Sequence, residues 1–133
     1  EVPSRGLGDV YKRQSLELIE NLGCQPGLVL NPDISLNVLE PYLEDIYMVL
    51  LMSLFPGFGG QKFIPEVLDK VKNLRQKIDE KNLEVRLEID GGVNSENISD
   101  ISSAGADTFV AGSAIFNNKN YSNAIKNLRD NFY

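Results

Sequence analysis

Three short glycine-bearing segments constrain the fold of this chain more than any other feature. They are LMSLFPGFGGQ from Leu51, LEIDGGV from Leu87 and VAGS from Val110. Each begins in an apolar, strand-like run and breaks at glycine, and the first and third then lead into a helical pattern. Because they recur at the length scale of consecutive βα units, they predict an α/β fold with a parallel sheet.

Glycine at the end of a strand also suits a phosphorylated ligand. It lets backbone N–H groups approach an anion closely, and the N-terminus of a following helix adds a favourable field. Asp90, between a strand and two glycines, is the only carboxylate set into one of these loops. The pattern therefore indicates an enzyme that acts on a sugar phosphate.

The order and spacing of the motifs resemble those of ribulose-phosphate 3-epimerases. The matching segments cover residues 51–63, 87–94 and 105–116, and the similarity extends back to about residue 15. The resemblance implies a (β/α)8 TIM barrel of the pentose phosphate pathway. It also implies that D-ribulose 5-phosphate and D-xylulose 5-phosphate are interconverted by proton transfer at C3, through a metal-stabilised enediolate.

The chain is short for such a barrel, which needs eight βα units and roughly 220 to 250 residues. It has 133 residues, and the pattern predicts four strands, each followed by a helix. These strands are expected near residues 27–31, 46–53, 85–90 and 107–111. We therefore expect the C-terminal half of a TIM barrel, inactive alone, from an enzyme that is a homo-oligomer at full length.

Residues 1–14 differ in character from the rest of the chain. EVPSRGLGDVYKRQ has no apolar period, whereas a helical pattern with Leu16, Ile19 and Leu22 on one face begins at Ser15. GDVYKRQ also looks like the translation of a sequencing adapter. We predict that residues 1–14 are adapter-derived or disordered and that residues 15–133 form the domain, the alternative being a genuine flexible tail.

Composition narrows the possible functions further. Apolar residues make up 42% of the chain, but no segment approaches the 18 consecutive apolar residues of a membrane helix. A net charge of −6 argues against a nucleic-acid surface. The single cysteine, Cys24, excludes an internal disulfide, and no secretory signal is evident. We expect a cytoplasmic protein without membrane or nucleic-acid partners.

The chain contains no histidine, which excludes any histidine-dependent dyad or triad within it. The resemblance implies one divalent metal ion (Zn, Fe, Mn or Co) in the full-length enzyme, held by two histidines and an aspartate from early strands and by a late aspartate. Asp90 matches only that late ligand. One carboxylate is too few ligands for a stable site, so we expect this chain not to retain the metal.

Strand alternation predicts where Asp90 lies. Val85, Leu87 and Ile89 share one face, which should pack on helices, so Arg86, Glu88 and Asp90 should face the barrel interior. Arg86 and Glu88 are expected to pair there. Asp90 lies at the carboxyl end of the strand, where barrel enzymes do chemistry, and by resemblance it is both a proton donor and a metal ligand. The alternative is a turn or N-cap aspartate.

The resemblance also implies a distributed substrate site. Gly91, Gly92, Gly112 and Ser113 would bind the phosphate, and Met52 would form an apolar wall beneath the sugar. A loop would close over the substrate, formed by Gly57, Phe58, Gly59 and Gly60. Ordinary glycine turns, a helix cap at Gly112 and a core methionine are the structural alternatives. Leu54–Phe55 departs from the family's small or polar pair before PGFGG.

The remaining segments predict an outer layer of helices. Residues 64–66 are expected to open a helix with Val67, Leu68, Val71, Leu74 and Ile78 on its buried face. Further helices are expected over residues 95–104 and 121–132, the last with Ala124, Ile125 and Leu128 facing inward.

Two other functions stay open from the sequence. One is a hexulose-phosphate epimerase or a related phosphosugar barrel enzyme. The other is a non-catalytic half-barrel that binds phosphate or assembles with another chain, because two open sheet edges and an apolar interior favour association.

Overall fold

The computed structural model describes residues 2–55 and 61–132. Its elements follow the order α1 (Val2–Asn21), β1 (Gly27–Leu30), the 3-10 helices η1 (Leu36–Leu39) and η2 (Leu43–Asp45), β2 (Met48–Met52), α2 (Val67–Glu80), β3 (Arg86–Asp90), α3 (Ile98–Ala104), β4 (Thr108–Val110), α4 (Ser113–Phe116) and α5 (Tyr121–Phe132).

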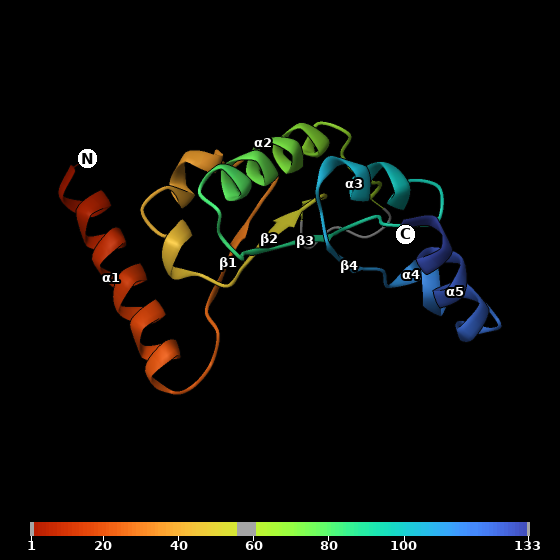
Figure 1. The fold of residues 1–133 in the computed structure, drawn as a ribbon, viewed down its shortest axis with the longest axis horizontal. Helices are drawn as coiled ribbons and strands as arrows, with labels where there is room; N and C mark the ends of the chain where they lie inside the picture. The colour runs from red at the N-terminus through yellow and green to blue at the C-terminus, as the bar shows by residue number, and fades with distance from the viewer. Residues whose placement is uncertain (1, 56–60, 133) are drawn as a thin grey trace.

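The four strands form one parallel sheet in the order β1-β2-β3-β4 (Figure 1). Neighbouring strands in the sheet are consecutive in the chain, as they are in a TIM barrel. The predicted α/β fold class, four βα units of a half-barrel, is therefore confirmed.

The first connection differs from the prediction in one respect. β1 is followed by the two 3-10 helices η1 and η2 and not by an α-helix. Pro32 and Pro41 flank η1, and proline restricts the residue before it as well as its own φ, which limits regular α-helix in so short a segment.

The core lies between one face of the sheet and the helices α2 and α3, which cover that face in Figure 1. Val49, Leu51, Leu87 and Ile89 alternate along β2 and β3 and are at most 1% exposed. Burial of each such side chain stabilises the fold by about 1.5–3 kcal/mol. Among the described residues, the sheet is stabilised mainly through this face.

Most of the predicted helical faces are confirmed. Val67, Val71, Leu74 and Ile78 of α2 are buried, and α3 ends at Gly105 as expected. Three details were wrong. Helix α3 begins at Ile98 and not at residue 95. The residues Ile64–Pro65–Glu66 precede α2 instead of opening it, because Glu66 is the N-cap. Ile125 is 37% exposed, since α5 packs through Ala124 and Leu128.

Helix α1 extends further than the sequence predicted, since it begins at Val2 and not at Ser15. Leu16 is buried, but Leu22 is 72% exposed because it lies beyond the end of the helix. Arg13 donates to the Asp45 carboxylate at 2.7 Å and to the Pro41 carbonyl at 2.5 Å. The hydrogen bond to Asp45 raises the pKa of Arg13. The origin of residues 1–14 stays a prediction.

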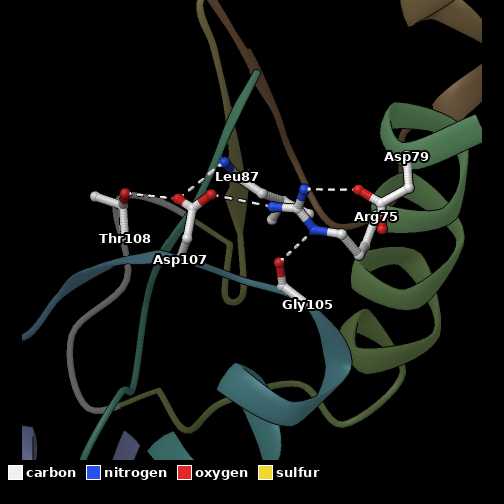
Figure 2. A network of polar contacts seen from close by, with 6 residues as sticks. All are labelled: Arg75, Asp79, Leu87, Gly105, Asp107 and Thr108. Carbon is white, nitrogen blue, oxygen red and sulfur yellow. Dashed lines mark hydrogen bonds and ion pairs between the residues drawn. The ribbon is translucent and has the colours of Figure 1, made fainter. Parts of the chain in front are cut away.

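A polar network joins α2 to the amino-terminal end of β4 (Figure 2). Arg75 donates to the Gly105 carbonyl at 2.9 Å and to the carboxylates of Asp107 at 3.0 Å and Asp79 at 3.3 Å. Asp107 also accepts from the Leu87 backbone N–H at 3.2 Å and from the Thr108 hydroxyl at 2.8 Å. The network holds α2, β3 and β4 together near the amino-terminal ends of the two strands, opposite to Asp90.

A second ion pair links the first connection to α2. Lys77 bonds to Glu40, and Lys81 lies 3.6 Å from the same carboxylate. The hydrogen bond from Lys77 lowers the pKa of Glu40.

None of the helices in the described residues combines the length and apolarity needed to cross a bilayer.

Candidate functional site at the carboxyl edge of the sheet

The carboxyl ends of β2, β3 and β4 meet at one edge of the sheet. Cross-strand register places Met52, Asp90 and Val110 side by side there. Met52 and Asp90 are both half-buried. The structure thus brings together a predicted wall residue and the predicted catalytic carboxylate, which lie far apart in the sequence.

Asp90 lies on the sheet face that the helices leave uncovered. Leu87 and Ile89 are buried on the helical side, whereas Glu88 and Asp90 are half-buried and Arg86 is exposed. The strand alternation predicted from the sequence is confirmed. Over the described residues, the Asp90 carboxylate has no hydrogen-bond or ion-pair partner.

The expected Arg86–Glu88 pair was wrong. Both residues lie in the described part of the chain, and no ion pair joins them. The prediction assumed a closed barrel, in which these charges are buried and need partners. On the open sheet face Arg86 is exposed and Glu88 only half-buried, so neither charge requires a partner.

Ser53, immediately after β2, is the residue that the sequence interpretation missed. It is completely buried, and its hydroxyl donates to the Gly91 carbonyl at 2.5 Å. Its backbone N–H donates to the Asp90 carbonyl at 2.9 Å, and its own carbonyl accepts from Ile64 at 2.8 Å. Ser53 therefore fixes the turn that carries Asp90. A serine directly after an apolar strand was the available signal.

Gly91 and Gly92 are required by the packing of this turn. Their φ angles are 133° and 69°, which L side chains rarely adopt. A Cβ on Gly91 would come within 2.6 Å of the Leu54 side chain, and one on Gly92 within 2.5 Å of the Phe63 backbone nitrogen. This steric requirement does not test the predicted role of Gly91 and Gly92 in phosphate binding, which stays a prediction.

A pair of asparagines holds the other side of the turn. The Asn97 side chain donates to the Gly92 carbonyl at 2.8 Å and accepts from the Asn94 backbone N–H at 2.9 Å. The Asn94 side chain accepts from the backbone N–H groups of Glu96 and Asn97. This motif was also missed, although an Asn-x-x-Asn spacing before a helix is a typical capping signal.

A groove of about 540 Å³ runs beside this turn. Gly92 and Ser113, both predicted phosphate ligands, line it together with Lys62, Asn94 and Asn97. Lys62 supplies a positive charge and Ser113 an exposed hydroxyl. Two of the predicted phosphate-binding residues therefore line the same groove, which has room for a small anion.

Gly112 and Ser113 begin the short helix α4. Gly112 is its N-cap, with a φ of −81°, and a Cβ there would meet no atom within 4 Å. Neither backbone conformation nor packing in the described residues demands glycine at this position, in contrast to Gly91 and Gly92. The open space around Gly112 would allow a ligand to approach its backbone closely.

The predicted closing loop lies mostly outside the described residues, since Gly57, Phe58, Gly59 and Gly60 belong to residues 56–60. The chain on either side of it is tied together. The Gln61 side chain accepts from the Phe55 backbone N–H at 3.1 Å and donates to the Phe55 carbonyl at 2.5 Å. Leu54 is half-buried against Gly91, and Phe55 is 42% exposed.

The residues present do not fit a metal centre. In the described part of the chain, no three His, Cys, Asp or Glu side chains are grouped closely enough to hold an ion. Asp90 is the only carboxylate at the ends of β2, β3 and β4. A stable transition-metal site needs more ligands than one carboxylate provides.

Comparison with known proteins shows the family of the chain. Residues 9–116 match the model of the ribulose-phosphate 3 epimerase family. The chain is similar to the ribulose-phosphate 3-epimerase of Escherichia coli, with 49% identity over 87% of this chain and 52% of that protein. It is also similar to ribulose-phosphate 3-epimerase 2 of Cupriavidus necator, with 54% identity over 77% of this chain and 44% of that protein. The chain spans about half the length of the curated relatives it matches.

Proposed function

Because the chain belongs to the ribulose-phosphate 3-epimerase family, we propose that it forms one half of a phosphosugar epimerase, with Asp90 as a catalytic acid or base. The substrate is D-ribulose 5-phosphate and the product D-xylulose 5-phosphate. We further propose a cytoplasmic, homo-oligomeric full-length enzyme, as the resemblance implies.

The single observation that supports this role is the position of Asp90. Its carboxylate lies at the carboxyl edge of a parallel sheet, on the uncovered face, beside Met52. Barrel enzymes place their chemistry at this edge. The Ser53 bonds to the backbone carbonyls of Asp90 and Gly91 hold in place the strand end that carries the carboxylate.

The chemistry needs proton transfer on both faces of C3. A carboxylate on one face removes the proton, the electron pair enters an enediolate, and an acid on the other face returns a proton. Asp90 performs one of these transfers. Among the described residues no second carboxylate lies at the ends of β2, β3 and β4, and the resemblance implies that the partner acid comes from the upstream half of the barrel.

The ribulose-phosphate 3-epimerase family is metal-dependent. The ligand set of this chain does not fit a metal, as described above, and we derive no step through one. The phosphate group of the substrate is proposed to bind in the groove that Gly92, Ser113 and Lys62 line. Backbone N–H groups and one lysine suit an anion there, even in a chain of net charge −6.

The test joins residues 15–133 to the complementary half of the Escherichia coli relative and measures epimerisation of D-ribulose 5-phosphate. Asp90→Asn should lower kcat by about 10²–10⁴-fold, because the amide transfers no proton. Its effect on KM should be small, since the shape of the side chain is kept.

Asp100→Asn is the matched control, because Asp100 is exposed on α3. It should leave kcat unchanged. Near-normal turnover by the Asp90→Asn protein, with the fusion folded by circular dichroism, would contradict the catalytic role of Asp90.

A further inference from the structure

The turn after β3 carries two backbone N–H groups that have no partner. Among the described residues, the N–H groups of Gly92 and Val93 donate to no acceptor. Val93 is only 4% exposed, and buried backbone N–H groups are almost always paired in folded proteins. Both residues line the groove of about 540 Å³ beside the turn. Two unpaired donors at the wall of one groove suit a ligand with acceptor oxygens.

The carbonyl groups of the same turn, in contrast, are both held by side chains. The Ser53 hydroxyl donates to the Gly91 carbonyl at 2.5 Å, and the Asn97 amide donates to the Gly92 carbonyl at 2.8 Å. In a trans peptide, the C=O of one residue and the N–H of the next point in opposite directions, and the chain has no cis peptide bond among the described residues. Ser53 therefore directs the Gly92 N–H away from itself, and Asn97 does the same for the Val93 N–H.

The peptide group between Gly91 and Gly92 depends most on such a bond. Because glycine lies on both sides of it, this peptide plane can rotate at little steric cost. Rotation by half a turn would exchange the N–H for the carbonyl, whose oxygen repels an anion. Ser53 is completely buried, so its hydroxyl holds the Gly91 carbonyl where water does not compete for it. One buried hydroxyl thus selects the orientation of this peptide group.

The charged side chains of the groove contribute little to anion binding. Lys62 and Glu96 both line it, and their opposite charges leave this pair without net charge. Both side chains are exposed, so water screens what remains. The attraction of the groove for an anion therefore depends on how the backbone N–H groups are oriented.

We propose that Ser53 and Asn97 are positioning residues for the phosphate group of the substrate. They hold the carbonyls of the turn, so that the N–H groups of Gly92 and Val93 donate to the phosphate oxygens. Ser53 acts through the peptide group and does not touch the substrate, because its hydroxyl is buried. The inference rests on the proposed function, which assigns the phosphate to this groove.

Titration of the 133-residue chain with inorganic phosphate, followed by amide NMR, tests the positioning role. Phosphate should shift the amide signals of Gly92 and Val93. Ser53→Ala should raise the dissociation constant for phosphate by about tenfold, because a hydrogen bond to a charged group is lost when the peptide rotates. Ser102→Ala is the matched control, since the Ser102 hydroxyl also donates to a backbone carbonyl, that of Phe132 at 3.3 Å. It should leave phosphate binding unchanged.

Two further variants separate positioning from a loss of stability. Ser53→Thr keeps the hydroxyl, so it should bind phosphate as the unchanged chain does, even where the added methyl group lowers stability. Asn97→Ala should weaken phosphate binding through the second carbonyl. Phosphate that shifts neither amide signal would overturn the proposal. So would equal phosphate affinities of the Ser53→Ala and Ser102→Ala chains, or a Ser53→Thr chain that binds as weakly as Ser53→Ala.

The proposed function and the positioning role can fail separately. In the fusion with the complementary half of the relative, Ser53→Ala should raise KM for D-ribulose 5-phosphate by about tenfold and change kcat less, the reverse of Asp90→Asn. The backbone bond from Ser53 to Asp90 is kept in this variant. A lower kcat with unchanged KM would overturn the positioning role. A fusion without epimerase activity would overturn the proposed function, while the phosphate titration of the chain still decides the role of Ser53.

Discussion

Gly91, Gly92 and Gly112 belong to two motifs that look alike in the sequence, yet the structure separates them. Gly91 and Gly92 have positive φ and lie against Leu54 and Phe63. Gly112 has an ordinary φ, and open space surrounds its missing Cβ. The first two glycines are therefore demanded by the fold, whereas only a ligand would demand the third.

The different surroundings of Gly92 and Gly112 lead to a prediction about stability. Gly92→Ala should lower the free energy of unfolding by about 2–3 kcal/mol, because of its left-handed backbone and the contact with the Phe63 backbone. Gly112→Ala should change it by less than about 0.5 kcal/mol. Urea denaturation of the two variants measures the difference. Equal losses would show that the turn relaxes around an added methyl group.

At the scale of elements, the segment from Gly105 to Phe116 has two ends with different roles. Asp107 and Gly105 belong to the network with Arg75 at the amino-terminal end of β4, while Gly112 and Ser113 follow its carboxyl end. A Cβ on Gly105 would lie 2.5 Å from the Arg75 side chain, which explains that glycine. Parallel strands in barrels divide in this way, with stability at one end and chemistry at the other.

Asp107 and Asp79 both bond to Arg75, and they allow a matched comparison. Asp107→Ala should cost about 1.5–3 kcal/mol, since it removes acceptors for Arg75, Leu87 and Thr108. Asp79→Ala should cost less than about 0.5 kcal/mol, because that pair is exposed and lies within one helix. Midpoints of urea unfolding give both values, and similar costs would mean that the network adds nothing beyond an exposed ion pair.

At the scale of the whole molecule, the described residues form four strands of a half-barrel, in a chain that spans about half the length of its relatives. Helices bury one face of the sheet, but the other face and both edges lack described partners. On this open face, Arg86 and Glu88 have no ion-pair partner among the described residues.

The extent of the folded unit is testable at this scale. We predict that residues 15–133 carry the fold, so deletion of residues 1–14 should change the free energy of unfolding by less than about 1 kcal/mol. The deletion removes Arg13 and Lys12 from the first connection, where Arg13 pairs with Asp45, and exposed ion pairs contribute little. Denaturant unfolding of the two lengths measures this. A larger loss of stability would assign residues 1–14 to the domain.

The sequence by itself determined the four strands, their parallel class, the inward parity of Asp90 and the buried face of α2. These depend on local periodicity, which neighbouring residues encode directly. Only the tertiary structure decided the contacts between distant segments. Ser53 against Gly91, Phe63 against Gly92 and Arg75 against Asp107 each join residues that are separated by another element. Such contacts depend on how strands align, and strand alignment emerges only when the sheet packs on its helices.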